Sequence, residues 1–429
     1  MVFFIYSYLC VDYKKIYSLT TLNKLKILND PIYGFISIPN TLLFDLIEHP
    51  YFQRLRRISQ MGMSYLVYPG AHHTRFHHAL GCMHMMQKAV QVLRFKNVLI
   101  SEEEETALYI AILLHDIGHG PFSHAMERSI VEHVHHEEIS LLFMSRLNEE
   151  FDGKLSLAIE IFKGKYHRKF MLQLISSQLD MDRMDYLKRD SFYSGVAEGN
   201  INSERLIQMI NVENDVLVVE EKGVYSVEMF LVARRLMYWQ AYLHKTSICA
   251  ELILTRILKR AKELTSQGKE LWASPSLAYF LKNQISLEAF NQEALAQFAL
   301  LDDSDILGAL KSWQFDSDFV LSELSKMIIN RDLLRIELIG KKSPKDSIEQ
   351  MRNDLARKYG ISKEEAKYFV FQGKVKNQAY AKDEEPIFIL KKNKEVVDVL
   401  EASDQLNLKA LTKTVTKYIV CYPKSGLER

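Results

Sequence analysis

The spacing of hydrophobic residues turns helical near residue 41. Asn40 can cap a helix that ends near Pro50, and YFQRLRRISQ begins another. Most segments between residues 76 and 265 have the pattern of amphipathic helices. Residues 101–116, SEEEETALYIAILLHD, illustrate this pattern. Ser101 and Glu104 have the spacing of a capping box, and the glutamate run falls in the first turn, where the helix dipole favours negative charge. The pattern therefore predicts a mainly α-helical body.

Shorter stretches have strand-like patterns. Residues 29–40, NDPIYGFISIPN, alternate aromatic and β-branched residues between turn residues and predict a strand or hairpin. The segment VLVVE, within the less regular residues 201–227, predicts a second small hairpin. Residues 330–345 are polar and basic and contain Gly340 and Pro344, so we expect a domain boundary there.

Helix and strand patterns both occur beyond that boundary. Ser362 and Glu365 predict a capped helix, and YFVFQGKVKNQAY, PIFILKKNKEVVDVL and KYIVCYP predict strands. The predicted fold class is mainly α, a helical body with small β-hairpins and a C-terminal α+β lobe. The predicted parts are an N-terminal extension (residues 1–28), the helical body (29–330) and the lobe (331–429).

Composition and charge narrow the function classes. Of the 429 residues, 48% are hydrophobic and 25% charged, which is ordinary globular composition. The 55 basic and 54 acidic residues nearly cancel, so nucleic acid is not indicated as a partner and any anion must bind in a local pocket. The apolar start MVFFIYSYLCVDYKK is short and has neither a preceding basic residue nor a cleavage site. We therefore expect neither a signal peptide nor a membrane anchor.

The cysteines indicate the compartment. Cys10, Cys82, Cys249 and Cys421 are far apart and form no C-x-x-C motif. This distribution argues against a disulfide framework or a cysteine zinc site and predicts a reducing, cytoplasmic location.

Residues with metal-binding chemistry gather in three separate segments. LLHDIGHGPFSH, residues 113–124, places His115 and Asp116 directly after an apolar run, where a charge is costly to bury unless it is paired or bound to a metal. YPGAHHTRFHHALG, residues 68–81, carries four histidines, and QLDMDRMDYLKRD, residues 178–190, carries four aspartates.

This combination suits metal-assisted hydrolysis. Two imidazoles and two carboxylates satisfy one divalent cation and leave positions open for water and substrate. Adjacent His115 and Asp116 lie about 100° apart on a helix and can still meet one ion between them. An isolated HD dipeptide is more often structural, and acidic residues in a basic segment usually form a solvated face. The combination of three motifs favours a metal site: H-x-x-G, then HD, then D-x-D-x-x-D-Y.

Several segments, in order, resemble the HD-domain metal-dependent phosphohydrolases. The similarity is to the deoxynucleoside triphosphate triphosphohydrolase branch, which includes the SAM-and-HD-domain enzyme and dGTPase-like proteins. The segments that carry it are FQRLRRISQMG, YPGAHHTRFHHALG, LLHDIGHGPFSHAME, HHEE, DMDRMDYLKRD and AYLHK. The resemblance covers about residues 29–265. It implies that metal hydroxide attacks the α-phosphorus of a dNTP, dGTP among the candidates, and releases deoxynucleoside and inorganic triphosphate. We expect no SAM domain, because too few residues precede the first predicted hairpin.

The resemblance also implies a metal-binding set. His78, which precedes x-x-G in RFHHALG, is the first ligand, and His115, Asp116 and Asp182 are the others. Mn, Mg, Fe, Ni and Zn are all compatible with such a set.

Residues after the HD pair are candidates for acid–base catalysis. His124 and Glu127 are three residues apart and share a helical face, where a carboxylate fixes the imidazole tautomer and raises its pKa. The resemblance implies that His124 protonates the departing nucleoside oxygen and that His119 and His136 line the phosphates. The alternative is an ordinary His–Glu pair at a helix start.

Candidate substrate contacts follow from the same resemblance. Arg75 and Arg183 match phosphate-binding positions, although the family usually has lysine where Arg183 stands. Gln60 and Asp190 match residues that hold the 3′-hydroxyl, and Tyr186 matches the aromatic residue that excludes a 2′-hydroxyl.

A further substrate-binding group lies in ARRLMYWQAYLHK. Arg234, Tyr238 and Tyr242 are spaced i, i+4, i+8 and are predicted to share one helical face, with an aromatic core stripe as the alternative. Leu243 stands where the SAM-and-HD-domain enzyme has a polar residue near the base.

Glu48, Gln53 and Arg56 match an allosteric nucleotide site in the FQRLR region, with a polar face between packed helices as the alternative. This match is the basis for two partner hypotheses, an activating nucleotide and a homodimer or homotetramer.

Two other functions compete with the dNTP triphosphohydrolase. One is an HD phosphohydrolase acting on a nucleoside monophosphate or a cyclic nucleotide. The other is a non-catalytic HD protein that binds a nucleotide or a nucleic acid. The complete ligand set and the His124–Glu127 pair favour an enzyme.

Overall fold

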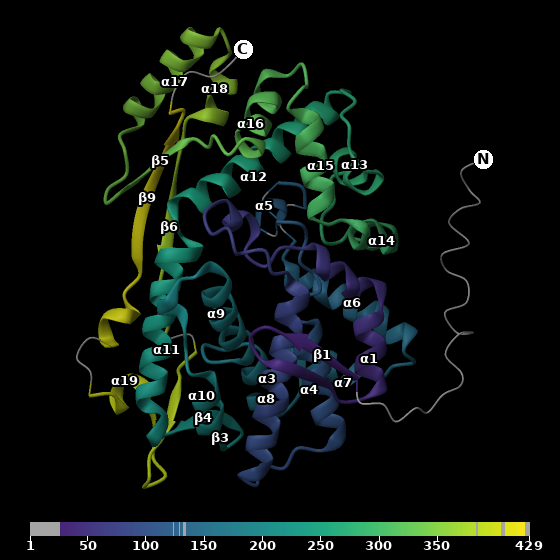
Figure 1. Cartoon of the computed structure of the whole chain (residues 1–429), viewed down its shortest axis with the longest axis vertical. Coiled ribbons are helices and arrows are strands. Elements are labelled where there is room, and N and C mark those ends of the chain that lie inside the picture. Colours follow the sequence, from purple (N-terminus) through teal and green to yellow (C-terminus); the bar gives the residue numbers. More distant parts are fainter. Residues whose placement is uncertain are drawn as a thin grey trace.

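A computed structural model describes residues 26–122, 124–127, 129–131, 134–382, 385–404 and 408–424 of the chain. The side chain of His124 and nearly all of the predicted N-terminal extension lie outside the described residues. The described chain is mainly helical, as predicted, with small sheets and a long pair of strands along one side (Figure 1).

Sixteen helices precede residue 330 in the described part of the chain. They are α1 (Thr41–Glu48), α2 (Pro50–Gln53), α3 (Arg75–Phe95), α4 (Glu102–Leu114), α5 (His124–Glu127), α6 (His136–Glu150), α7 (Ser156–Phe162), α8 (Lys169–Ile175), α9 (Met181–Ser194), α10 (Ser203–Met209), α11 (Val224–Met237), α12 (Lys245–Ser266), α13 (Pro275–Lys282), α14 (Gln292–Leu300), α15 (Asp303–Trp313) and α16 (Phe319–Ile329). The C-terminal region adds α17 (Lys345–Tyr359), α18 (Lys363–Phe369) and α19 (Val399–Ala402). None of the helices described here has the length and apolarity needed to cross a membrane.

Capping side chains start several of these helices at the predicted positions. The Asn40 side chain accepts a hydrogen bond from the Leu43 amide (2.9 Å) and starts α1. At α4, Ser101 and Glu104 form the predicted capping box, with N···O distances of 3.1 and 2.8 Å. Because these caps satisfy amides that have no partner inside the helix, the sequence alone locates the helix starts.

Both predicted hairpins are present. β1 (Lys26–Asp30) pairs antiparallel with β2 (Gly34–Ile38), and Asp30 Oδ1 accepts hydrogen bonds from two amides of the turn between them. β3 (Ile210–Glu213) pairs antiparallel with β4 (Val216–Glu220).

The C-terminal strands form two sheets. β5 (Arg335–Ile339), β9 (Val415–Tyr422) and β6 (Phe371–Asn377) form an antiparallel sheet in the order β5-β9-β6. β7 (Phe388–Leu390) and β8 (Val396–Asp398) extend the β3-β4 hairpin, with β7 parallel to β4. The C-terminal region therefore packs along the helical body and completes one of its sheets (Figure 1).

Two local features differ from the sequence expectations. Strand β5 lies inside the polar stretch expected to be a boundary, because the short alternation in RIELI pairs with β9, far away in sequence. The segment expected to form one helix from YFQRLRRISQ is α2 followed by a 3₁₀ turn at Arg54–Arg57. The fully buried Arg54 in that turn donates hydrogen bonds to the carbonyl oxygens of His119 (2.9 Å) and Ile117 (2.7 Å) and so fixes the loop after the HD pair.

Candidate metal centre and active site

Three helices bring the predicted metal-binding residues together. His78 lies in the first turns of α3, His115 and Asp116 directly follow α4, and Asp182 lies in the first turn of α9. Asp180 caps α9 by accepting a hydrogen bond from the Arg183 amide (2.7 Å). The caps and the mutual packing of these helices bring three segments that are distant in sequence to one point.

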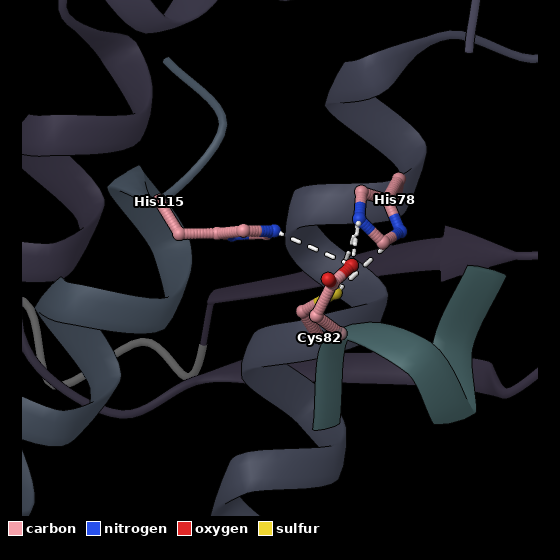
Figure 2. Close-up of side chains that lie close together, drawn as sticks. His78, Cys82 and His115 are labelled. Carbon is pink, nitrogen blue, oxygen red and sulfur yellow. Dashed lines mark hydrogen bonds and ion pairs between the residues drawn. The ribbon is translucent and has the colours of Figure 1, made fainter. Parts of the chain in front are cut away.

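The four predicted ligand groups converge closely. His78 Nε2 lies 3.0 Å from Asp182 Oδ1, and His115 Nε2 lies 3.5 Å from the same oxygen. Asp116 Oδ1 lies 3.5 Å from His115 Nε2, and Asp116 Oδ2 lies 3.7 Å from His78 Nε2. Figure 2 shows the two imidazoles approaching from α3 and from the end of α4. One ligand atom from each of His78, His115 and Asp182 lies within 4.8 Å of the others, and Asp116 borders this set through both histidines.

The other ring nitrogen of each imidazole contacts an acceptor that orients the ring. His78 Nδ1 lies 2.8 Å from Asp185 Oδ2, and His115 Nδ1 lies 2.7 Å from the Ile112 carbonyl oxygen. Metal-bound histidines almost always donate the other ring N–H to such an acceptor. His115 Nε2 is buried and faces Asp182 Oδ1 at 3.5 Å. An inward-facing nitrogen of this kind fits a metal ligand.

The charges of the two carboxylates also suit a cation. Burial alone would raise the pKa of the Asp182 carboxyl, but hydrogen bonds from His115 and His78 lower it below its usual range. Burial would likewise raise the pKa of the Asp116 carboxyl, but the nearby His115 and His119 lower it. Both groups are therefore ionised at neutral pH and can accept a divalent ion.

A buried ion network lies behind His78. Arg189 donates hydrogen bonds from Nε and Nη2 to Asp185 (2.9 and 3.0 Å) and from Nη1 to Asp30 (2.7 Å), and all three side chains are buried. Sequence reasoning missed Arg189 and Asp30. The i, i+4 spacing of Asp185 and Arg189 was a usable signal, but Asp30 comes from β1, 159 residues away.

The four clustered histidines have different surroundings. His78 joins the metal-binding set, while His73 Nε2 lies 2.7 Å from Asp190 Oδ1. His77 accepts a hydrogen bond from the Thr74 amide at the start of α3 (3.2 Å), and His72 is exposed. Of these four histidines, His78 is the one whose ring lies beside His115 and Asp182.

His119 and His136 stack next to Asp116, with ring centroids 3.8 Å apart. His119 Nε2 lies 3.2 Å from Asp116 Oδ1, and His136 Nδ1 lies 3.1 Å from Glu127 Oε1. Burial and the charge of Arg75 lower the pKa of His119, so its imidazole is neutral. Burial also opposes protonation of His136, but the hydrogen bond with Glu127 raises its pKa.

The predicted His124–Glu127 pair falls partly outside the described residues. His124 begins α5, but its side chain is not described. Glu127 contacts His136, which joins these two predicted catalytic residues. The acid role of His124 stays a prediction.

Gly118 lies where two segments of the site come very close. A Cβ atom there would lie 2.2 Å from the His136 carbonyl oxygen and 2.3 Å from the Ser140 amide nitrogen. We expect Gly118→Ala to destabilise the protein by about 1–3 kcal/mol and to lower activity, because backbone atoms cannot move aside easily. Gly340→Ala is the matched control, since a Cβ there would meet nothing within 4 Å. Equal urea midpoints for the two variants would contradict this prediction.

The predicted sugar-binding residues form a connected group next to the metal-binding set. The Tyr186 ring lies 6.4 Å from the His78 ring and 5.9 Å from the Tyr242 ring. Tyr242 donates a hydrogen bond to Asp190 Oδ2 (2.6 Å). The backbone N–H of Gln60 donates to the His73 carbonyl oxygen (3.0 Å), next to this group.

The three predicted substrate-binding arginines differ in their partners. Arg75 pairs with Asp116, and Arg183 pairs with Asp180. Arg234 lies over the Tyr238 ring at 6.0 Å. In the described part of the chain, Nε and Nη1 of Arg234 are buried without a hydrogen-bond partner.

The predicted regular helical face of Arg234, Tyr238 and Tyr242 is interrupted. Helix α11 ends at Met237, and Tyr238–Tyr242 form a π-helical turn in which the Leu243 amide donates to the Tyr238 carbonyl oxygen (2.7 Å). Single π turns inside helices are frequent at functional sites. Tyr238 and Tyr242 remain neighbours, with ring centroids 5.2 Å apart.

The predicted regulatory residues make ordinary surface contacts. Arg56 Nε donates to Gln53 Oε1 (2.8 Å), and the Arg56 guanidinium lies over the Phe76 ring at 3.6 Å. Gln53 also donates to the Ile47 carbonyl oxygen (2.8 Å), and Glu48 is exposed at the end of α1. A nucleotide site there stays a prediction.

Comparisons with known proteins match these regions. An HD domain matches residues 75–190, which include all four predicted metal ligands, and an HD associated region matches residues 201–273. The phosphohydrolase of Bacteroides thetaiotaomicron has a crystal structure that is 51% identical, with a TM-score of 0.90, and covers 94% of this chain and 100% of that chain.

Relatives in sequence come from distant organisms. The protein YwfO of Bacillus subtilis is 36% identical over 323 residues, which are 73% of this chain and 72% of YwfO. Human deoxynucleoside triphosphate triphosphohydrolase SAMHD1 is 28% identical over 380 residues, which are 77% of this chain and 57% of the human protein. HD domains bind divalent metal ions, and the convergent histidines and aspartates described above can hold one. The chain belongs to the HD-domain phosphohydrolase family.

Proposed function

We propose that this hydrolase converts a deoxynucleoside triphosphate to the deoxynucleoside and inorganic triphosphate. The observation that carries the proposal is the position of Tyr186, 6.4 Å from the His78 ring, between the metal-binding set and the Tyr242–Asp190 pair. This arrangement suits a substrate whose phosphates lie at the metal and whose sugar lies against the tyrosine. Relatives named as deoxynucleoside triphosphate triphosphohydrolases, in human and Dictyostelium, support the choice of substrate.

His78, His115, Asp116 and Asp182 would hold the divalent ion. The inward-facing Nε2 of His115 and the lowered pKa values of both carboxyls fit this role. A bound ion would supply Lewis-acid polarisation of a phosphoryl oxygen and a lowered pKa for water.

Arginines would hold the triphosphate. Arg75 and Arg183 already pair with Asp116 and Asp180 and would exchange part of that pairing for phosphate oxygens. Arg234 offers two buried N–H groups that make no hydrogen bond within the described chain, which suits an anionic ligand. The guanidinium fork matches the oxygens of phosphate.

Histidines would move the proton. His119, neutral because burial and Arg75 lower its pKa, can donate a hydrogen bond to a phosphate oxygen. The hydrogen bond with Glu127 raises the pKa of His136, and a protonated His136 would add positive charge next to His119. In this proposal His124, at the start of α5, protonates the departing nucleoside oxygen.

The sugar would lie between Tyr186 and the Asp190–Tyr242 pair. Asp190 accepts hydrogen bonds and, with Gln60, would hold the 3′-hydroxyl. The Tyr186 ring would occupy the space that a 2′-hydroxyl needs and so favour deoxynucleotides.

The proposed function also includes a compartment and partners. Free Cys82, Cys249 and Cys421 within the described chain suit a reducing cytoplasm. We also propose a homodimer or homotetramer, with activation by a second nucleotide at Glu48, Gln53 and Arg56, whose side chains lie at the surface near the end of α1. Size-exclusion chromatography with and without dNTP tests the assembly.

One product analysis tests the reaction. The protein is incubated with each dNTP and each NTP in the presence of Mn²⁺ or Mg²⁺, and the products are separated by anion exchange. Release of intact triphosphate and deoxynucleoside is the expected result. Orthophosphate from a dNMP would instead support a nucleoside monophosphate phosphohydrolase, and no product from any nucleotide would favour a binding protein.

Tyr186→Ala tests the sugar contact. We expect the preference for dNTP over NTP, measured as the ratio of kcat/KM values, to fall by about 10-fold or more, because the space for a 2′-hydroxyl opens. Tyr225→Ala, which removes a tyrosine that is 62% exposed, is the control and should leave the ratio unchanged. An unchanged ratio in Tyr186→Ala would remove this tyrosine from sugar discrimination.

A further inference from the structure

His73 contacts both of the residues that are predicted to hold the 3′-hydroxyl group. Its Nε2 atom lies 2.7 Å from Asp190 Oδ1, and both side chains are almost completely buried. Its carbonyl oxygen accepts a hydrogen bond from the backbone N–H of Gln60 (3.0 Å). The sequence motifs assign no role to His73, because they indicate His78 as the metal ligand of the same segment.

The hydrogen bonds of Asp190 show what the His73 ring does. A carboxylate accepts hydrogen bonds and donates none, so His73 donates from Nε2 to Oδ1 and Tyr242 donates from its hydroxyl to Oδ2 (2.6 Å). The second ring nitrogen of His73, Nδ1, has no hydrogen-bond partner in the described part of the chain. One donor on each oxygen holds the plane of the carboxylate, and each oxygen keeps a lone pair for a further donor.

The loop that carries His73 packs tightly against α9, the helix of Asp190. The His73 ring stacks on the Tyr193 ring, with centroids 4.3 Å apart and an angle of 14° between the planes. At Gly70 a Cβ atom would lie 2.6 Å from the Tyr193 carbonyl oxygen, so a larger residue would push the loop away from α9. Because the stack and this close approach fix the imidazole, the position of its N–H is set before a ligand arrives.

An unpaired acceptor next to His73 marks the place of a ligand that donates a hydrogen bond. The side-chain oxygen Oε1 of Gln60 is buried and has no hydrogen-bond partner among the residues that the structure describes. A buried acceptor without a partner costs free energy, so it fits a donor that a ligand supplies. A sugar hydroxyl is such a donor, and Asp190 offers it a second acceptor.

We propose that His73 is a positioning residue for recognition of the 3′-hydroxyl: its N–H holds the Asp190 carboxylate where the sugar hydroxyl donates to it. His73 itself does not contact the nucleotide. The enzyme therefore discriminates a 2′-deoxynucleotide from a 2′,3′-dideoxynucleotide, because a site built to bind a hydroxyl rejects an analogue that leaves its buried polar groups unpaired. The inference rests on the proposed function and deepens it.

A competition assay on the unaltered protein is the first test. A dNTP and the 2′,3′-dideoxynucleoside triphosphate of the same base are mixed in equal amounts with Mn²⁺, and the two released nucleosides are quantified. We expect about 10-fold more deoxynucleoside, or a larger excess. Equal amounts of the two products overturn the proposal, because no contact with the 3′-hydroxyl then exists for His73 to support. This test needs no substitution, so it decides the matter even if variants of His73 fail to fold.

Two variants separate the hydrogen bond of His73 from its packing. His73→Phe keeps a ring that can stack on Tyr193 and removes the N–H, whereas His73→Gln keeps an N–H in a similar position. We expect kcat/KM for the dNTP to fall by about 10-fold or more in His73→Phe and by less than about threefold in His73→Gln. The dideoxynucleotide, measured as a competitive inhibitor, lacks the hydroxyl that Asp190 binds, so its Ki should change by less than about twofold in both variants.

His72→Phe is the matched control, because His72 precedes His73 in the chain but is exposed. This variant should keep the wild-type values of both constants. A His73→Phe protein in which the Ki rises as much as kcat/KM falls has lost the shape of the site, and that result overturns the proposal. An unchanged kcat/KM in His73→Phe overturns it as well.

The failure of this inference and the failure of the proposed function give different results. Triphosphate release with equal losses for the two nucleotides means that only the role of His73 is wrong. Orthophosphate release from a dNMP means that the proposed reaction is wrong, and the same comparison between a dNMP and its dideoxy analogue then decides the role of His73. A protein that gives no product from any nucleotide contradicts the proposed function and the inference together.

Discussion

Replacing His115 with alanine is expected to remove bound metal and hydrolytic activity together. His115 Nε2 faces both Asp116 and Asp182 at 3.5 Å, so its loss opens the ligand set and leaves two adjacent carboxylates. A metal contributes several kcal/mol to stabilising the transition state in such hydrolases. Since about 1.4 kcal/mol corresponds to tenfold in rate, we expect kcat/KM to fall by about 1000-fold or more.

Metal content by elemental analysis and turnover on the best dNTP measure this effect. His72→Ala is the matched control, because His72 lies in the same histidine-rich segment but is exposed. The control should keep both metal and activity. The double variant His115→Ala, Asp116→Ala should have turnover as low as that of the single variant, or lower. Full turnover in His115→Ala would exclude the metal assignment.

Replacing Arg189 with leucine is expected to be the most destabilising single change at the site. Arg189 neutralises Asp185 and Asp30, and all three side chains are buried. Removing one partner from a buried ion network leaves uncompensated charge and costs about 3–5 kcal/mol. Because Asp185 also orients His78 (2.8 Å), metal affinity should fall in the same variant.

Urea unfolding followed by circular dichroism, together with zinc affinity, tests this second expectation. Arg357→Leu is the control, because the Arg357 side chain is 77% exposed and its pair with Asp354 is at the surface. Such surface pairs contribute about 0–1 kcal/mol, so the control should unfold near the wild-type midpoint. Similar midpoints for the two variants would show that the buried network adds little stability.

Local signals in the sequence predicted much of the fold. The caps at Asn40, Ser101 and Ser362 satisfy amides within a few residues, so the sequence alone indicates where α1, α4 and α18 begin. The hairpins β1-β2 and β3-β4 likewise depend on nearby turn residues. By contrast, β5 exists because β9 pairs with it, and no local signal in the polar residues around it indicates that partner.

The metal-binding set shows the same division. Resemblance to the family predicted His78, His115, Asp116 and Asp182 as ligands, and in the structure each of the two histidines lies within 3.7 Å of both aspartates. Neither the motifs nor their spacing indicated Cys82. Only the structure shows that its thiol lies beside the His78 ring, 3.5 and 3.6 Å from the two ring nitrogens.

The sequence by itself determined the family, the mainly helical fold, the helix starts and the residue types of the centre, because these depend on local spacing and on chemistry carried by single side chains. Only the tertiary structure decided which histidine contacts which carboxylate, and that Arg189 joins β1 to α9 through Asp30. Those contacts join residues far apart along the chain. They form when helices bury their shared faces, and that packing fixes side-chain geometry that no local pattern encodes.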